Sequence, residues 1–267
     1  MNRISDSQWE HFEREGYVLL GNVATGDTLA GLQQRIDEIM LGNAGVDYQR
    51  MLMQLDSADG VYESAGEQTR GFKGERLDYR KIEQLENDAL FLAYMQHPVF
   101  EDAARRVYGD VPISAFRAMM MNKPARRGTQ LPLHQDRWRA LDRDPLLTIY
   151  TALDAADETN GCVEIIPRTH HTLLNPQHGS GFLTAEMAAC YDDHPDRMPL
   201  RLQAGEVALL HNWTLHASGI NSTNRPRRAF SVCLMEAATV NLRYGQPAAR
   251  SIIFGEGALL PENCRSA

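Results

Sequence analysis

The chain has 267 residues, of which 43% are hydrophobic and 23% are charged, values that are ordinary for a globular enzyme. Its 27 basic and 35 acidic residues give a net charge of −8, which argues against a nucleic-acid groove, because such a groove needs a basic face. The sequence shows no apolar run typical of a membrane span or a signal peptide, so neither is expected. The four cysteines lack zinc-site spacing, and we expect free thiols in a reducing cytoplasm.

The N-terminal part of the chain, residues 1–108, is predicted to be mostly helical support. Capping residues and apolar periodicity define the expected elements: a helix ending at Gly16, a strand at 17–23, a helix at 27–41 and a helical stretch from about 80 to 108. Residues 43–76 are rich in glycine and polar side chains, which predicts a long loop. Loops of that length are usually functional, so this one is expected to be a lid over a site.

The pattern changes to β in residues 109–240, which are predicted to form the core of the fold. Alternating apolar runs define the expected strands, at 113–124, 131–138, 146–156, 162–171, 206–219 and 227–237. Asn160-Gly161 lies between two of these runs and predicts a hairpin turn. No linker-like stretch separates the two parts, so we expect one domain over 1–267, with a C-terminal tail at 241–267.

The triplet His134-Gln135-Asp136 falls in one of the predicted strands. Because side chains alternate along a strand, His134 and Asp136 point to the same face and can occupy two corners of one metal site. His216, 80 residues further on in another predicted strand, can supply a third ligand. Two histidines and one carboxylate with open positions are typical of non-haem Fe(II) oxygenases. A second triplet, at 194–196, lies in a proline- and aspartate-rich loop too close to His216, and is set aside.

Arg227 begins the predicted strand that follows His216, 11 residues after that histidine. Alternation places it on one face with Ala229, Ser231 and Cys233. An arginine on the inner face of a barrel is costly unless it pairs with a carboxylate, and its planar guanidinium suits bidentate binding. A dicarboxylate cosubstrate that chelates the metal at one end would present its other carboxylate to Arg227.

The order of these motifs resembles the phytanoyl-CoA dioxygenase family of Fe(II)/2-oxoglutarate oxygenases. The resemblance covers most of the chain and rests on EGYVLL, MMMNKP, LPLHQD, TIYTALDAADETNGCVEIIPRTHH and LHASGINSTNRPRRAFS. It implies a mainly β fold with α additions. This is a double-stranded β-helix, or jelly roll of two facing sheets, supported by N-terminal helices.

The resemblance also implies Fe(II), 2-oxoglutarate as cosubstrate and O₂. Residue by residue, His134, Asp136 and His216 resemble the iron ligands, and Arg227 resembles the residue that binds the distal carboxylate of 2-oxoglutarate. Other positions that line the cosubstrate pocket in the family are matched by Ser218, Lys81, Met119 and Tyr150.

The implied reaction is oxidation of a C–H bond of a small molecule, with release of succinate and CO₂. Hydroxylation, oxidative cyclisation and desaturation stay open, whereas halogenating relatives lack the carboxylate that Asp136 supplies. The compact size fits relatives that tailor natural products; the sequence identifies neither the substrate nor the oligomeric state. Hypothetical substrate contacts are Trp138 and, in the loop 43–76, Tyr62, Arg70 and Lys73.

Two other classes of protein stay open as alternatives. A metal-dependent, non-oxidative enzyme on a cupin-like barrel would use the same ligands with zinc or manganese. Such an enzyme has no dicarboxylate cosubstrate and so does not require a buried Arg227. A binding protein with a relic site would be expected to have lost a ligand.

Ordinary structural roles are predicted for several other residues near the motifs. His211, which shares the predicted strand 206–219 with His216, is expected to be a core or surface residue and not a ligand, and Met120 is expected in the core. Solvated or structural positions are expected for Arg225, Arg228, His170 and His171.

Overall fold

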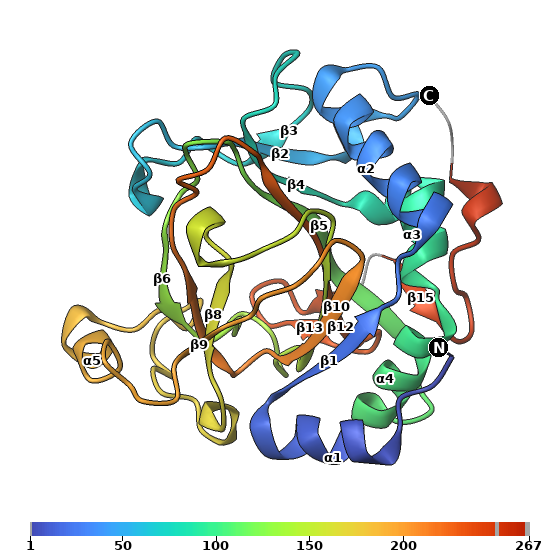
Figure 1. Ribbon diagram of the computed structural model, residues 1–267. Helices are drawn as coiled ribbons and strands as arrows, with labels where there is room; N and C mark the ends of the chain where they lie inside the picture. The colour runs from blue at the N-terminus through green and yellow to red at the C-terminus, as the bar shows by residue number, and fades with distance from the viewer. Residues whose placement is uncertain (1, 249–250, 265–267) are drawn as a thin grey trace.

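The computed structural model describes residues 2–248 and 251–264 (Figure 1). Its α-helices are α1 (Asp6–Glu15), α2 (Gly26–Leu41), α3 (Ala89–Met95), α4 (Pro98–Tyr108) and α5 (Ala185–Ala189). Its strands are β1 (Tyr17–Asn22), β2 (Leu52–Leu55), β3 (Thr69–Arg70), β4 (Tyr79–Glu83), β5 (Ile113–Lys123), β6 (Leu131–His134), β7 (Leu147–Ala152), β8 (Val163–Ile166), β9 (Met198–Pro199), β10 (Glu206–His211), β11 (Leu215–Ser218), β12 (Arg227–Glu236), β13 (Val240–Asn241), β14 (Gln246–Pro247) and β15 (Ile252–Phe254). Among the described residues, no helix has the length and apolar character needed to cross a membrane.

Helix α1 begins and ends where its sequence signals place it. The Ser5 side chain accepts a hydrogen bond from the Gln8 backbone N–H, and the Gln8 side chain accepts one from the Ser5 N–H, which is a capping box. Gly16 ends the helix at φ 81°, and a Cβ there would lie 2.5 Å from both His170 Nδ1 and Thr214 Oγ1. The close approach fixes α1 against loops of the β body and requires glycine.

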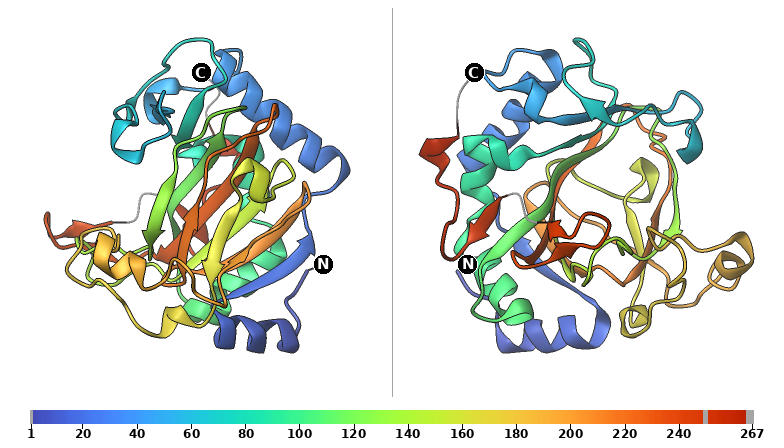
Figure 2. Two further views of the ribbon diagram at one scale, coloured as in Figure 1. Left: turned by 60° about the vertical axis from the view of Figure 1, so that its left-hand side comes forward. Right: turned by 180° about the vertical axis from the view of Figure 1, so that it is seen from behind.

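Two antiparallel sheets face each other and form the jelly roll. The larger sheet runs β1-β10-β7-β12-β5-β4-β2-β3, with β15 also paired to β5, and the smaller runs β6-β11-β8-β9. Helices α2, α3 and α4 lie on the outer side of the larger sheet, and the smaller sheet lies on its other side (Figures 1 and 2). The predicted mainly β fold with N-terminal supporting helices is confirmed.

The strands at the centre of the larger sheet separate apolar and polar residues onto their two faces. Met120 on β5 pairs with Phe230 on β12, and both belong to the main hydrophobic core, which includes residues of α2, α3 and α4. Their neighbours Met119 and Ser231 also pair, and point toward the smaller sheet. The expected core position of Met120 is therefore correct, and the space between the sheets is left for the polar face.

The N-terminal third contains more β structure than predicted. Residues 43–76 are not a simple loop, because β2 and β3 lie within them and extend the larger sheet. The predicted helical stretch from 80 is wrong at its start, since β4 joins β2 to β5. Lys81 therefore lies on a strand. The short strands carry few alternations, which is why periodicity did not reveal them.

Two expected features of the β body are also wrong. Asn160-Gly161 does not make a hairpin: it ends the 3-10 helix Glu158–Asn160, and β7 and β8 belong to different sheets. The predicted strand 206–219 is two strands, β10 in the larger sheet and β11 in the smaller. In both cases the chain crosses between sheets, and a local apolar pattern is the same on either side of such a crossing.

Candidate active site

A cavity of about 290 Å³ lies between the two sheets. It is lined by residues from β4, β5, β7, β10 and β12 of the larger sheet and from β6, β8 and β11 of the smaller. The predicted site residues that line it are His134, Asp136, His216, Arg227, Ser218, Lys81, Met119, Tyr150, Trp138 and Tyr62. The fold thus brings together side chains that are far apart in the sequence.

The three predicted metal ligands converge in this cavity. His134 ends β6 and pairs directly with His216 on β11. Asp136 lies just beyond β6, where its N–H donates to the Asn212 carbonyl at 2.7 Å. The Nε2 atoms of His134 and His216 are 3.8 and 3.9 Å from the Asp136 carboxylate oxygens, and a ligand atom from each residue lies within 4.8 Å of the other two. One ion can reach all three.

Hydrogen bonds at Nδ1 orient both histidines for metal binding. Nδ1 of His134 lies 2.8 Å from the Pro132 carbonyl, and Nδ1 of His216 lies 2.8 Å from the Thr214 carbonyl. A carbonyl only accepts, so Nδ1 carries a proton in both rings, and Nε2 is the ring atom left to bind a metal in the cavity. Burial, reinforced by His216, lowers the pKa of His134 to about 3. The donor set of two imidazole Nε2 atoms and one carboxylate fits Fe(II).

The polar side chain between the two ligands of the triplet anchors the loop that follows. Gln135 is fully buried, and its amide donates to the carbonyls of Thr172 and Trp213 while its oxygen accepts from the Leu174 N–H. These bonds tie the ligand-bearing segment to two other loops. Gln135 thereby holds the positions of its neighbours His134 and Asp136.

Arg227 is buried at the inner face of β12 beside Tyr150. Its Nη1 donates to the Tyr150 hydroxyl and its Nη2 donates to the Gly161 carbonyl, both at 2.6 Å. Its Nε is buried with no hydrogen-bond partner, and no carboxylate among the described residues pairs with the guanidinium. A buried guanidinium held only by neutral groups still needs an anion. This supports the predicted role as carboxylate-binding residue.

The other predicted cosubstrate residues surround the same space. Met119 on β5 and Tyr150 on β7 are buried on the two strands that flank β12, each opposite Ser231. Ser218 ends β11, two residues past His216. Lys81 points into the cavity, with its Nζ 3.1 Å from Glu83 Oε1.

Some residues of the site were missed by the sequence interpretation. Lys123, paired with Arg227 across β5 and β12, is buried, and its Nζ donates to the Thr129 carbonyl at 2.6 Å. Burial, with Arg227 and Arg80 nearby, lowers the pKa of Lys123 to about 6. The signal was present, because Lys123 follows Met119 by four residues in the strand that begins at Ile113 and therefore lies on the same face. Arg80 and Arg117 also line the cavity.

The predicted substrate contacts divide into two groups. Trp138 and Tyr62 line the cavity, and the Trp138 ring lies edge-on to Phe116 at 4.6 Å between centroids. Arg70 and Lys73 do not line it: Arg70 donates to the Gln49 carbonyl and Lys73 to the Thr69 hydroxyl. The structure does not bring these two residues to the cavity, because Arg70 lies in β3 at the edge of the larger sheet and Lys73 follows that strand.

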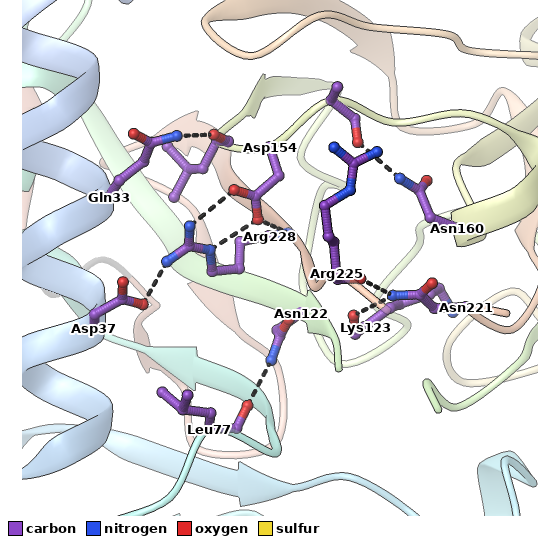
Figure 3. A network of polar contacts seen from close by, with 12 residues as sticks. Gln33, Asp37, Leu77, Asn122, Lys123, Asp154, Asn160, Asn221, Arg225 and Arg228 are labelled. Atoms are coloured by element: carbon purple, nitrogen blue, oxygen red, sulfur yellow. Dashed lines mark hydrogen bonds and ion pairs between the residues drawn. The ribbon is translucent and has the colours of Figure 1, made fainter. Parts of the chain in front are cut away.

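Arg228 is not the solvated turn residue that was predicted. It is mostly buried, and its guanidinium bonds to Asp154 at 2.8 Å and to Asp37 of helix α2 (Figure 3). It ties the larger sheet to a supporting helix, on the face opposite to Arg227. Arg225 is exposed, as expected.

One expectation about the remaining histidines, the strand that carries His211, is wrong. His211 ends β10, lines the cavity and is outside the His134–Asp136–His216 cluster, but it does not share a strand with His216 as predicted. His170 is buried and its Nε2 bonds to the Glu13 carbonyl, which is a structural role, while His171 is exposed.

The fold and the site together define a class of protein. A jelly roll that directs two histidines, one carboxylate and a buried arginine into one cavity is the arrangement of a non-haem iron dioxygenase that uses 2-oxoglutarate. The chain matches the phytanoyl-CoA dioxygenase (PhyH) family over residues 12–229, and it belongs to that family. The predicted family and class of enzyme are confirmed.

Individual relatives agree with this assignment. The probable phytanoyl-CoA dioxygenase of Caenorhabditis elegans is 25% identical over 240 residues, covering 85% of this chain and 74% of the relative. Phytanoyl-CoA dioxygenase domain-containing protein 1 of Mus musculus is 25% identical over 270 residues, covering 88% of this chain and 91% of the relative.

Solved structures share the fold at lower identity. EctD from S. alaskensis, solved with 2-oxoglutarate and 5-hydroxyectoine, has a TM-score of 0.68 at 19% identity, covering 96% of this chain and 82% of that one. The non-heme alpha ketoglutarate dependent carbocyclase SnoK from nogalamycin biosynthesis has a TM-score of 0.65 at 17% identity, covering 94% and 95%. At these identities the likeness shows the fold.

Proposed function

We propose that this enzyme oxidises a C–H bond of a small molecule, a natural-product intermediate, while 2-oxoglutarate and O₂ are converted to succinate and CO₂. The observation that carries the proposal is that the triad of His134, Asp136 and His216 and the buried Arg227 face one cavity. We also propose that residues 1–267 form a single catalytic domain. The proposed location of the enzyme is the cytoplasm.

In this proposal His134, Asp136 and His216 hold Fe(II). When bound, the iron with 2-oxoglutarate and O₂ supplies the oxidising power, and the protein supplies orientation and exclusion of side reactions. The carbonyls of Pro132 and Thr214 fix the two imidazoles through Nδ1, which keeps Nε2 available as the ligand atom.

Arg227 receives the distal carboxylate of 2-oxoglutarate. The Tyr150 hydroxyl and the Gly161 carbonyl hold its guanidinium in place before the anion arrives, which lowers the cost of ordering it on binding. Ser218 and Lys81 supply further polar contacts, and Met119 shapes the wall of the cosubstrate pocket.

The substrate meets Trp138 and Tyr62, which bring aromatic surface to the cavity. The likeness to SnoK, whose described role is in nogalamycin biosynthesis, supports a natural-product substrate. Hydroxylation, cyclisation and desaturation all use this ligand set and differ in the pose of the substrate. Halogenation does not fit, because Asp136 fills the coordination position that a halide would need.

The test is succinate formation by the purified protein with Fe(II), 2-oxoglutarate and O₂, followed by mass spectrometry of candidate substrates. We expect succinate that depends on added Fe(II), and a product that gains one oxygen or loses two hydrogens. Absence of succinate with fully metal-loaded protein would refute the proposal, and a chlorinated product in the presence of chloride would refute the role of Asp136.

A further inference from the structure

Strand β4 brings two consecutive residues, Arg80 and Lys81, to the cavity. In a regular strand consecutive side chains point to opposite faces. Here Gln54 of β2 pairs with Lys81, whereas the next residue, Leu55, pairs with Tyr79, so Arg80 is the extra residue of a β-bulge. A bulge re-aims side chains and is common next to active sites. It lets Arg80 join Lys81 at the cavity.

Arg80 is held there by neutral groups alone. Its Nη1 donates to the Gln54 side-chain oxygen at 2.7 Å, and its guanidinium lies over the Tyr62 ring, 5.0 Å from the centroid. Within the described part of the chain, no carboxylate is in ion-pair distance of it. The Asp56 carboxylate, which is nearby, instead accepts from the Gly128 and Thr129 backbone N–H groups and from the Thr129 hydroxyl.

Two other cations of the cavity, Lys81 and Arg117, share one carboxylate, and the Lys123 Nζ donates to the Thr129 carbonyl with its pKa lowered to about 6 by burial. The Glu83 carboxylate lies 3.1 Å from Lys81 and 3.9 Å from Arg117. Arg227 is assigned to 2-oxoglutarate. Fe(II) and doubly ionised 2-oxoglutarate together carry no net charge, so their binding leaves Arg80 uncompensated. A largely buried guanidinium in this position requires an anion.

We propose that Arg80 binds an oxyanion group of the substrate, a carboxylate or a phosphate, while the aromatic rings of Tyr62 and Trp138 contact the rest of the molecule. This rests on the proposed function and defines its substrate class as small organic anions. A guanidinium binds both kinds of oxyanion through paired N–H donors. Substrates that carry an amide or ester at the same position lose that charge-assisted contact.

The test is calorimetric titration of the full chain loaded with Zn(II), which does not turn over, and saturated with 2-oxoglutarate. The probes are phenylacetate, phenyl phosphate and the neutral phenylacetamide. We expect one or both anions to bind roughly tenfold or more tightly than the amide, since a hydrogen bond to a charged group has that value. The stronger anion identifies the head group as carboxylate or phosphate.

Variants then assign the preference to Arg80. Arg80→Gln is expected to remove it and Arg80→Lys to restore part of it. Arg243→Gln is the matched control, because Arg243 also lies over a tyrosine ring, Tyr244, but is exposed and outside the cavity. Equal affinity for anions and amide, no binding of either anion, or a preference that survives in Arg80→Gln overturns the inference.

Failure here is separable from failure of the proposed function. The titration measures equilibrium binding with Zn(II), whereas the proposed function fails only if the wild-type enzyme with Fe(II) makes no succinate. An enzyme that makes succinate but shows no anion preference would retain the proposed function and lose the assignment of Arg80.

Discussion

Strands β5 and β12 have two faces with different surroundings, one packed against the helices and one lining the cavity. On the helix side, Met120 and Phe230 are fully buried among apolar side chains. On the cavity side, Arg227 and Lys123 are almost as buried but lie among polar groups. Burial of apolar surface provides free energy for folding, whereas burial of a charge costs it. The helix side therefore supplies stability to the fold, and the cavity side is available for binding.

The largest effect is expected where the cavity side meets the metal. His216→Ala removes one of three ligands, and we expect complete loss of iron-dependent succinate formation with the fold intact, because His216 is not part of the apolar core. The measurement is succinate release together with iron content and circular dichroism. A variant that keeps full iron and turnover would show that His216 is not a ligand.

The opposite outcome is expected on the helix side. Phe230 packs on Phe91 at 4.8 Å between ring centroids, and Phe230→Ala should lower the free energy of unfolding by about 3–5 kcal/mol. Denaturant unfolding measures this, and the folded fraction should still bind 2-oxoglutarate. The neighbouring Ser231→Ala, on the cavity face, is the control and should change stability by less than about 1 kcal/mol. Equal losses of unfolding free energy in the two variants would show that the two faces contribute equally to stability, which would contradict this account.

Arg228 allows the two faces of β12 to be compared at adjacent positions, because it follows Arg227 directly and faces the helix side. Arg228→Ala removes the bonds to Asp154 and Asp37 and should cost about 1–3 kcal/mol of stability without changing the Kd of 2-oxoglutarate. The exposed Arg225→Ala should leave both quantities unchanged. Thermal unfolding and cosubstrate titration of the three proteins check this. A weakened Kd in Arg228→Ala would contradict the facing of β12.

A smaller effect is expected from the group that holds Arg227. Tyr150→Phe removes the hydroxyl that accepts from Arg227 Nη1 and nothing else. The loss of one such bond is about 1 kcal/mol, or roughly fivefold in the Kd of 2-oxoglutarate. Calorimetric titration measures it. An unchanged Kd would mean that the guanidinium is oriented without Tyr150.

Long strands with clear alternation were predicted well from the sequence. Segments where the chain crosses from one sheet to the other were predicted poorly. Strand β5 is long enough for its alternation to separate Met119 from Met120 correctly. The segment from Glu206 to Ser218 fails because its apolar pattern continues through a turn that switches sheets. Only long-range pairing decides which sheet receives a strand, and a local pattern does not contain that information.

The candidate site was predictable where spacing and family motifs coincide, as for His134, Asp136 and Arg227, all of which line the cavity. Arg80 was not predictable, because a bulge places it and a bulge depends on register between strands. The sequence predicted a loop around Arg70, and a loop leaves the direction of a side chain open. Burial of Arg228 against Asp37 likewise required knowing where helix α2 docks.

The most direct test of the account is the affinity of Zn(II)-loaded Arg227→Ala for 2-oxoglutarate. Truncating one partner of a buried, hydrogen-bonded charge pair typically costs about 2–5 kcal/mol, or roughly 30- to several-thousand-fold in Kd. We expect a loss of that size with unchanged metal content, and partial recovery in Arg227→Lys, whose ammonium lacks the planar fork. Wild-type affinity in Arg227→Ala would contradict the assignment of the cavity face of β12 to the cosubstrate.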